Sequence, residues 1–270
     1  MKSKLIALDI DGTILDKSAG VSVPHSVRMA VRDAREAGAH VCLCSSRPCF
    51  FMDDASADLD EVDSLVGCSG ATIEMLNASG VKNGEKIYKD QMPSELIIAA
   101  YEIAKKHKLY ASFCTEEKVL VRKRGPLKPP TAVVSVFHVM SDAGLLKELN
   151  ARAIFCAYIF LEPGMEDKIL TDVPLLKNAT MYHSGHNCLT VTNGGTDKGS
   201  GVLRLAKHLG INREEILAIG NDENDIPMLK AAGIGVAVAN ASPGVLAVAD
   251  WIAPDVREGG AAEAIRRFAL

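Results

Sequence analysis

The sequence lacks a long uninterrupted apolar run, and this absence argues against a membrane protein. The least charged stretch, residues 231–253, takes its apolarity mostly from Ala, Gly and Val, and Asn240, Pro243 and Asp250 interrupt it. We therefore expect strand, turn, short helix and strand there, not a membrane span. The apolar run behind the basic N-terminus stops at Asp9, which is too short for a signal peptide. The expected location is the cytoplasm, with no membrane partner.

The sequence also lacks an excess of positive charge and any regular cysteine spacing. A net charge of −4 gives no bulk electrostatic attraction for nucleic acid, so none is expected as a partner. The seven cysteines include no C-x-x-C pair, so a disulfide framework is not expected either. What is present is 48% hydrophobic content over 270 residues, enough to bury one large core or two smaller ones.

Three side chains of types that can bind a metal alternate along one predicted strand. His40, Cys42 and Cys44 would share a face of that strand. A zinc site would use such side chains, but buried thiols in a core strand are the favoured interpretation. Cys49 follows shortly after, near the site proposed below, and we expect it to be sensitive to oxidation but not catalytic.

Two carboxylates follow a short apolar strand near the start of the chain. Leu5 to Leu8 have the length and apolarity of a strand buried on both faces of a parallel sheet, and Asp9 and Asp11 come at its end. Gly12 lets the chain turn at once, which leaves both carboxylates at the edge where open α/β sheets bind ligands. Two charges about 4 Å apart repel by about 4 kcal/mol at an effective dielectric of about 20. Mg²⁺ would remove that repulsion; the alternative is a pair of turn-capping aspartates.

Four short motifs occur in a fixed order along the chain. They are D-x-D-G-T at 9–13, S-S-R-P at 45–48, a lysine in G-G-T-D-K-G at 194–199, and G-N-D-E-N-D at 220–225. In these motifs the sequence resembles the haloacid dehalogenase superfamily, and its Cof-like phosphatase branch fits best. The resemblance covers nearly the whole chain. It implies a Mg²⁺-dependent phosphatase that forms an aspartyl-phosphate on Asp9, with Asp11 as general acid and base.

The resemblance also assigns the phosphate-binding residues. Lys198 would hold Asp9 and the phosphoryl oxygens, and Asn224 would touch phosphate or substrate. Ser45 and Ser46 would bind phosphate through a hydroxyl and free backbone N–H groups at a strand-to-helix junction. The family motif usually reads Thr-Gly-Arg, so Ser46 adds a side chain where glycine normally lies. The local alternatives are a helix N-cap at Ser45 and an exposed surface lysine at Lys198.

The metal ligands implied by the resemblance are Asp9, Asp11 and Asn221. Most family members carry Asp where this chain has Asn221. An amide oxygen is still a hard ligand but brings no charge, so we expect Asn221 to coordinate Mg²⁺ with lower affinity. Asp222 and Asp225 are close enough in sequence to compensate, directly or through water. Asp225 would alternatively orient the lysine, or simply stabilise a helix N-terminus.

The element pattern predicts a doubly wound, Rossmann-like α/β core interrupted by an insert, and the resemblance implies that this insert is an α/β cap. The expected elements are a helix at 24–37, strands at 41–44 and 65–68, a hairpin at 110–114 and 118–123, a β-rich run at 132–140, a helix at 145–152, a strand at 154–161 and a return into the core at 187–192. Helices and strands alternate again from Lys198 onward. With the resemblance, this gives a discontinuous core of residues 1–81 and 186–270 and a cap of residues 82–185.

Substrate choice is expected to lie in the cap, which would close over the phosphate and exclude water. Its basic cluster consists of Arg122, Lys123, Arg124 and Lys128. This cluster would meet a second anionic group on the substrate, or merely guard a strand edge with charge. His183 and His186 near the return to the core leave the same two interpretations open.

Three functions fit these observations. The leading hypothesis is a phosphatase acting on small phosphorylated metabolites, such as sugar phosphates, nucleotides or cofactor phosphates. The second is a phosphomutase, which uses the same aspartate pair but returns the phosphate to a second hydroxyl. The third is a binding or regulatory protein that kept the fold while Asn221 weakened its metal site. The oligomeric state is not encoded in any motif.

Overall fold

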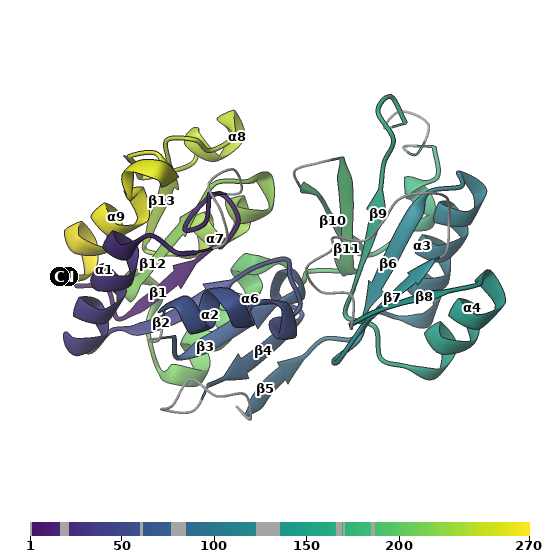
Figure 1. Cartoon of the computed structure of the whole chain (residues 1–270), viewed down its shortest axis with the longest axis horizontal. Helices are drawn as coiled ribbons and strands as arrows, with labels where there is room; N and C mark the ends of the chain where they lie inside the picture. The colour runs from purple at the N-terminus through teal and green to yellow at the C-terminus, as the bar shows by residue number, and fades with distance from the viewer. Residues whose placement is uncertain are drawn as a thin grey trace. The chain divides into compact units, whose positions relative to one another are not determined.

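The computed structural model describes residues 2–16, 22–59, 62–76, 85–122, 136–165, 169, 171–184 and 187–270. The chain forms two compact units, one made of Met1–Lys89 and Asp197–Leu270 and the other of Asp90–Thr196 (Figure 1). The limits expected from the sequence, at 81/82 and 185/186, fall on segments outside the described residues. The structure divides instead at Lys89/Asp90 and Thr196/Asp197.

The first unit contains an eight-stranded sheet with the order β14-β13-β12-β1-β2-β3-β4-β5. Its strands are β1 (Leu5–Leu8), β2 (His40–Cys44), β3 (Ser64–Gly67), β4 (Thr72–Met75), β5 (Lys86–Lys89), β12 (Ile216–Gly220), β13 (Ile234–Val238) and β14 (Trp251–Ala253). Neighbouring strands from β14 to β3 are parallel, and β4 and β5 join as antiparallel strands. Its helices are α1 (His25–Glu36), α2 (Asp53–Leu59), α6 (Lys198–Leu209), α7 (Ile226–Ala231), α8 (Pro243–Leu246) and α9 (Gly260–Ala269), and its 3-10 turns are η1 (Cys49–Phe51), η2 (Cys68–Gly70), η5 (Arg213–Glu215), η6 (Glu223–Asp225) and η7 (Val256–Glu258).

Alternate side chains of β1 enter two separate apolar cores. Ile6 and Leu8 pack in the core that includes residues of α1, α2 and α9. Leu5 and Ala7 pack in the core that includes residues of α6, α7 and α8. All four are fully buried, because successive residues of a strand point to opposite faces. Helices therefore cover both faces of a mostly parallel sheet, which confirms the predicted doubly wound α/β fold.

The carboxyl edge of this sheet gathers the residues that the motifs single out. Leu8 of β1 pairs with Leu43 of β2 and with Ile219 of β12. Parallel strands end at the same edge of a sheet, so the residues that follow these three strands lie at one edge. These following segments begin at Asp9, Ser45 and Asn221.

The second unit contains a six-stranded sheet with the order β10-β11-β9-β6-β7-β8. Its elements are α3 (Ser94–Lys106), β6 (Tyr110–Cys114), β7 (Val119–Arg122), β8 (Phe137–Met140), α4 (Asp142–Ala151), β9 (Cys156–Phe160), η4 (Val173–Leu175), β10 (Ala179–Ser184) and β11 (Cys188–Asn193). Residues of α3 and α4 share one apolar core with β6, β7, β9 and β11. The predicted hairpin is confirmed, since β6 and β7 pair antiparallel.

The prediction that residues 187–192 return into the core is wrong. This segment is β11, which pairs antiparallel with β9 and β10 inside the second unit. Its apolar residues Leu189 and Val191 pack in the core of that unit. The sequence shows a strand there, but the residues of a strand do not by themselves specify the strands with which it pairs.

The apolar stretch 231–253 forms β13, α8 and β14, as expected from its interruptions. Among the described residues, no helix is long and apolar enough to cross a membrane. Of the β-rich run expected at 132–140, residues 132–135 lie outside the described part, and Phe137–Met140 forms β8. The expected helices at 24–37 and 145–152 correspond to α1 and α4.

Candidate active site

A buried lysine joins two carboxylates from distant parts of the chain. The Nζ of Lys198 lies 2.7 Å from Oδ1 of Asp9 and 2.5 Å from Oδ1 of Asp225. The three residues are only 1%, 4% and 0% exposed, respectively. A charge buried this deeply must be paired and hydrogen-bonded. Lys198 is therefore not an exposed surface lysine, and the structure brings three predicted site residues together.

Lys198 occupies this position because it opens α6. The preceding residue, Asp197, is the N-cap, and its carboxylate accepts a hydrogen bond from the backbone N–H of Ser200 at 2.6 Å. A cation in the first helical turn opposes the helix dipole. The carboxylates of Asp9 and Asp225 offset that unfavourable interaction. The position of Lys198 at the helix start directs its ammonium toward the carboxyl edge of the sheet.

Asp225 is held in place by the backbone that precedes it. Its Oδ2 accepts hydrogen bonds from the backbone N–H groups of Asn221 at 2.8 Å and Asp222 at 3.0 Å. A Cβ at Gly220 would lie 2.6 Å from the Cβ of Asp225, so only glycine leaves room for this turn. Both carboxylate oxygens of Asp225 are thus bonded within the protein, one of them to Lys198. This arrangement suits a residue that orients the lysine.

Burial and charge shift the ionisation of this cluster. Burial and the nearby Asp225 carboxylate raise the pKa of Asp9, Lys198 acts in the opposite direction, and together they place the pKa at about 7. For Lys198, burial lowers the pKa, but Asp225 and Asp9 outweigh burial and hold the pKa above its ordinary value. The ammonium therefore persists. A cation bound beside Asp9 would favour the carboxylate form of that side chain.

The amide of Asn221 lies among three oxygen atoms of the D-x-D-G-T segment. One terminal atom of the amide is 2.8 Å from Oγ1 of Thr13, 3.1 Å from Oδ2 of Asp9 and 3.0 Å from the backbone carbonyl oxygen of Asp11. The carboxylate and the carbonyl can only accept hydrogen bonds. The amide nitrogen therefore faces these atoms when no cation is bound.

The same atoms fit magnesium when the amide oxygen faces them. Octahedral Mg²⁺ holds its oxygen ligands about 2.0–2.1 Å away, which places neighbouring ligand oxygens about 2.9 Å apart. The measured separations of 3.0 and 3.1 Å are close to that value. Asp9 would contribute a carboxylate oxygen and Asn221 an amide oxygen. Asp11 would contribute its backbone carbonyl, an atom that sequence reasoning did not specify.

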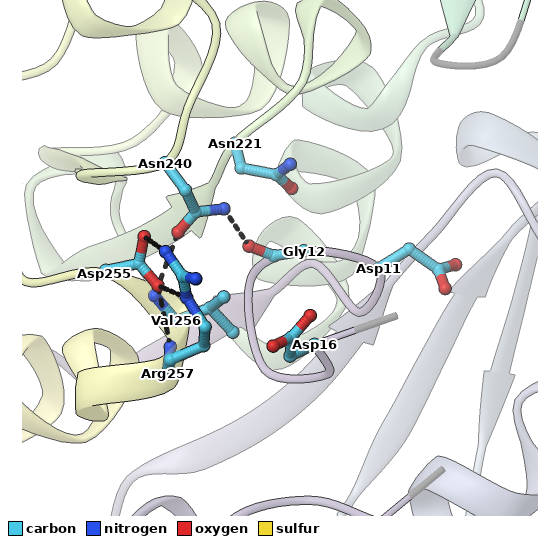
Figure 2. A pocket seen from close by; sticks show the side chains of 8 residues that line it. All are labelled: Asp11, Gly12, Asp16, Asn221, Asn240, Asp255, Val256 and Arg257. Atoms are coloured by element: carbon cyan, nitrogen blue, oxygen red, sulfur yellow. Dashed lines mark hydrogen bonds and ion pairs between the residues drawn. The ribbon is translucent and has the colours of Figure 1, made fainter. Parts of the chain in front are cut away.

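The side chain of Asp11 forms a separate ion pair. Nε of Arg47 donates to Oδ2 of Asp11 at 2.7 Å, and Nη2 donates to Oδ1. Arg47 also donates to the carbonyl oxygen of Phe51 at 3.4 Å. Figure 2 shows the Asp11 carboxylate pointing away from Asn240. The side chain of Asp11 is 25% exposed, so solvent and substrate can reach it.

The serine motif differs in part from the predicted anion site. Ser45 is buried, and its own N–H donates to the carbonyl oxygen of Val66 at 2.9 Å, so this N–H is not free for phosphate. The hydroxyl oxygen of Ser45 accepts the N–H of Arg47 at 3.2 Å, and the hydroxyl proton can still be donated. Ser45 is not a helix N-cap, because Pro48 takes that place before η1. Ser46 is half-buried next to it.

The fourth motif supplies a buried oxygen without a partner. Asn224 is only 4% exposed, and its Oδ1 has no hydrogen-bond partner in the part of the chain that the structure describes. Leaving such an oxygen unpaired is unfavourable, so a ligand hydroxyl or water is the expected donor. Asp222 instead caps η6, where its carboxylate accepts the N–H of Glu223 at 2.9 Å.

Sequence reasoning gave no role to Asn240, which holds the loop of the first motif. Its Nδ2 donates to the carbonyl oxygen of Gly12 at 2.8 Å, and its Oδ1 accepts the N–H of Val256 at 2.9 Å. Asn240 and Asn221 line one pocket of about 230 Å³, and Figure 2 shows the side chains around it. Asn240 comes two residues after β13, so its place at a strand end was the available signal. Thr13 and Arg47 were inside known motifs but carried no predicted role.

The basic cluster expected in the cap is not a free anion site at Arg122. This residue is 8% exposed, and its guanidinium donates to Asp142 at 2.6 and 3.1 Å and to the carbonyl oxygen of Leu109 at 3.3 Å. Arg122 therefore ties β7 to α4. Lys123, Arg124 and Lys128 lie outside the described residues, as does His186; His183 is exposed on β10.

All seven cysteines are buried and free of disulfides. Cys42 and Cys44 lie in an apolar core, which confirms buried thiols in β2, and His40 contacts the hydroxyl of Ser64 at 2.9 Å. Cys49 is buried, and burial raises the pKa of its thiol to about 12; the neutral thiol is the unreactive form, which argues against the expected sensitivity to oxidation.

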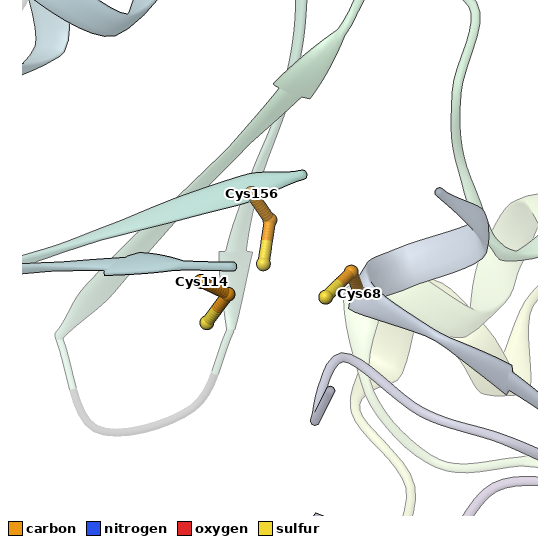
Figure 3. Close-up of side chains that lie close together, drawn as sticks. All are labelled: Cys68, Cys114 and Cys156. Carbon is orange, nitrogen blue, oxygen red and sulfur yellow. The ribbon is translucent and has the colours of Figure 1, made fainter. Parts of the chain in front are cut away.

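Two further cysteines occupy facing positions in the six-stranded sheet. Figure 3 shows Cys114 of β6 and Cys156 of β9, which are paired in the antiparallel register of these strands. Tyr158, two residues further along β9, accepts a hydrogen bond from the thiol of Cys156 at 3.3 Å. These thiols therefore belong to the framework of the second unit.

Comparison with known proteins places these features in a family context. The model of the haloacid dehalogenase-like hydrolases matches residues 6–265. The chain is 27% identical over 274 residues to the putative phosphatase YxeH of Bacillus subtilis, covering 99% of this chain and 98% of that protein. It is 28% identical over 267 residues to a phosphoglycolate phosphatase of Methanothermobacter thermautotrophicus, covering 98% of each. Among solved structures, the subclass IIB sugar phosphatase BT4131 has a TM-score of 0.84 at 24% identity, covering 98% of this chain and 99% of that one.

Proposed function

Because this chain belongs to the haloacid dehalogenase-like hydrolases and is a phosphatase of their Cof-like branch, we propose that it hydrolyses small phosphorylated metabolites through an aspartyl-phosphate on Asp9. The observation that carries the proposal is the position of Asp9. One of its oxygens faces the buried ammonium of Lys198, and the other faces Asn221 and Thr13. When a cation is bound, the Asp9 carboxylate lies between two positive charges, the Lys198 ammonium and the cation.

The first half of the proposed reaction transfers the phosphoryl group to the protein. A carboxylate oxygen of Asp9 forms a bond to phosphorus while the bond from phosphorus to the substrate oxygen breaks. Asp11 gives its proton to that leaving oxygen, which departs as an alcohol. Splitting the reaction in this way suits phosphate monoesters, whose hydrolysis requires accelerations up to about 10²¹-fold.

The second half releases inorganic phosphate. Asp11 removes a proton from a water molecule as its oxygen attacks the phosphorus of the aspartyl-phosphate. The bond between phosphorus and the Asp9 oxygen breaks, and the Asp9 carboxylate is restored. Asp11 carries the proton again, so both residues are ready for the next substrate molecule.

The remaining residues neutralise and hold the transferred group. Lys198 stays charged because Asp225 and Asp9 stabilise its ammonium, and it would pair with phosphoryl oxygens as their charge develops. The Ser45 hydroxyl and the Asn224 side chain would hold the phosphate and the substrate. Mg²⁺, held by Asp9, Asn221 and the Asp11 carbonyl, would neutralise phosphoryl charge and orient the oxygens for in-line attack.

The proposed substrate class follows from the relatives. One related protein is named for phosphoglycolate and one structural relative for sugar phosphates. We therefore place the substrate of this chain among small organic phosphates. A second candidate function, phosphomutase, has no separate structural observation in its favour, and the test below distinguishes it.

The test compares Asp9→Asn with Asp54→Asn, a matched change at an exposed position of α2. Wild type and Asp54→Asn should release phosphate and alcohol in equal amounts from an aryl phosphate and from a panel of sugar phosphates, only when Mg²⁺ is present. Asp9→Asn should lose this activity and should no longer be trapped by borohydride as a reduced aspartyl-phosphate. Undiminished turnover by Asp9→Asn would refute the mechanism, and conversion of a sugar phosphate to its isomer without phosphate release would identify a phosphomutase.

A further inference from the structure

The cation site of this chain is internally satisfied when it holds no metal. The Asn221 amide nitrogen has two hydrogens to share among Oγ1 of Thr13, Oδ2 of Asp9 and the carbonyl oxygen of Asp11, at 2.8, 3.1 and 3.0 Å. The Thr13 hydroxyl donates its own hydrogen to Oδ2 of Asp9 at 3.1 Å. The Asp9 and Asp11 oxygens that would bind a cation therefore both have a hydrogen-bond donor from the protein.

An aspartate at position 221 could not form this arrangement. Both of its terminal atoms would be oxygens, and one would lie about 3 Å from the Asp9 carboxylate without a proton or a cation between them. Like charges at that distance destabilise the metal-free protein, because burial leaves little water to screen them. Asparagine exchanges one of these oxygens for a donor of nearly the same size and shape.

We propose that Asn221 is a reversible plug of the cation site: its amide nitrogen takes the position of a ligand atom and points its hydrogens at the other ligand oxygens, and a half-turn of the amide about its own axis presents the oxygen there when a metal binds. The plug rests on the cation site of the proposed function. It stabilises the metal-free protein and weakens metal binding, since the metal must displace hydrogen bonds that already satisfy Asp9 and Asp11.

The surroundings of Asn221 permit this half-turn without a change of backbone. Gly12 has a φ of 90° and no side chain, and a Cβ there would lie 2.6 Å from the terminal atom of the Asn221 amide that faces away from Asp9 and Asp11. The amide therefore packs directly against the Gly12 backbone, in a slot that the planar group fits in either orientation. The backbone N–H of Asn221 remains fixed to Asp225 in both states.

Asn221→Asp and Asn240→Asp form a matched pair for the test. Both side chains are amides in the same pocket, and both changes add one negative charge (Figure 2). The Asn240 amide donates to the carbonyl oxygen of Gly12, not to the cation site. Thermal unfolding would be measured in EDTA and in excess Mg²⁺ without substrate, and Mg²⁺ affinity would be measured by titration calorimetry.

The plug predicts that the Tm difference from wild type depends on Mg²⁺ for Asn221→Asp but not for Asn240→Asp. Asn221→Asp should lower the Tm in EDTA by about 2–4 °C or more, gain more Tm than wild type on adding Mg²⁺, and bind Mg²⁺ at least about tenfold more tightly. Asn240→Asp should lower the Tm to the same extent with and without Mg²⁺. Equal Mg²⁺ affinity of wild type and Asn221→Asp would overturn the plug. No Mg²⁺ binding by either protein would overturn the metal dependence of the proposed function as well.

The amide itself supplies a second measurement if Asn221→Asp fails to fold. With ¹⁵N-labelled asparagine, the Asn221 side-chain NH₂ signals are identified by their loss in Asn221→Ala. In EDTA these two hydrogens should exchange slowly with solvent, and Mg²⁺ should shift the signals and speed their exchange as the nitrogen turns outward. Signals that exchange rapidly in EDTA, or that Mg²⁺ leaves unchanged, contradict the proposal.

Discussion

Arg47 binds both carboxylate oxygens of Asp11 in a fork, with Nε 2.7 Å from Oδ2 and Nη2 on Oδ1. Each carboxylate oxygen keeps a free lone pair in this geometry, so a proton can still be taken up. A planar guanidinium fixes a carboxylate more precisely than an ammonium does. Arg47 therefore positions the group that we propose as general acid and base.

Replacing Arg47 by lysine should lower kcat by about tenfold or more, because a point charge cannot reproduce the fork. The KM for an aryl phosphate should change less than kcat, since the substrate keeps its other contacts. Steady-state kinetics on Arg47→Lys, Asp11→Asn and the double variant checks this. The double variant should be no slower than Asp11→Asn alone, because Arg47 acts through Asp11; additive losses would show that Arg47 acts elsewhere.

Replacing Lys198 by methionine should destabilise the protein by about 3–5 kcal/mol, because it leaves the buried carboxylates of Asp9 and Asp225 without their common partner. Urea unfolding in EDTA measures this effect. Lys207→Met is the control, since Lys207 lies exposed on the same helix. A Lys198→Met protein as stable as the control would mean that the buried ion pairs contribute nothing to the fold.

Acid should weaken the second unit through Asp172. Hydrogen bonds from Lys106 at 2.8 and 2.9 Å and from His107 at 2.5 Å hold the pKa of Asp172 below its ordinary value. A carboxyl with a lowered pKa in the folded state contributes stability above its unfolded pKa of about 3.9, and that contribution disappears as pH falls through the lower folded value.

Asp172→Asn should therefore be less stable than wild type at pH 7, and the difference should shrink below about pH 4. Urea unfolding between pH 7 and pH 2.5 gives the curve, with Asp54→Asn as the exposed control. A constant difference across this range would assign the effect to packing rather than to the charge of Asp172.

The core thiols should resist alkylation in the folded protein. Burial raises the pKa of both Cys42 and Cys49 to about 12, so about one in ten thousand of either is ionised at pH 8. Iodoacetamide at pH 8 should leave both unmodified by mass spectrometry, whereas in urea every cysteine should react. Rapid labelling of native Cys49 would restore the oxidation-sensitive role first expected for it.

The strand-end residues were the most predictable part of the site. Buried parallel strands read as short apolar runs, and the residue after each run lies at the ligand-binding edge. For that reason the sequence placed Asp9, Ser45 and Asn221 correctly at one edge. The same logic does not distinguish side-chain from backbone ligands. It therefore assigned the Asp11 carboxylate to Mg²⁺, whereas in the structure the backbone carbonyl of Asp11 lies at the cation site.

Pairings between distant side chains were not predictable. Arg122 looked like one member of an exposed basic cluster, yet Asp142, twenty positions further on, takes it out of solvent. Strand β11 looked like a core strand because its residues do not by themselves specify the strands with which it pairs. Both errors have the same origin. Composition and periodicity show that a segment carries charge or must bury apolar side chains, but they do not show which distant residue pairs with the charge or which sheet the segment joins.

The ion pair between Asp9 and Lys198 closes a loop of 189 residues. During synthesis at about 5–20 residues per second, the nucleophile strand leaves the ribosome well before its lysine has been translated. For that interval Asp9 has no permanent counter-charge, and the parallel sheet lacks its central neighbour β12. The second unit, by contrast, is contiguous and complete before Lys198 appears. Nascent chains stopped just before β12 should therefore contain a folded insert and an unfinished catalytic unit.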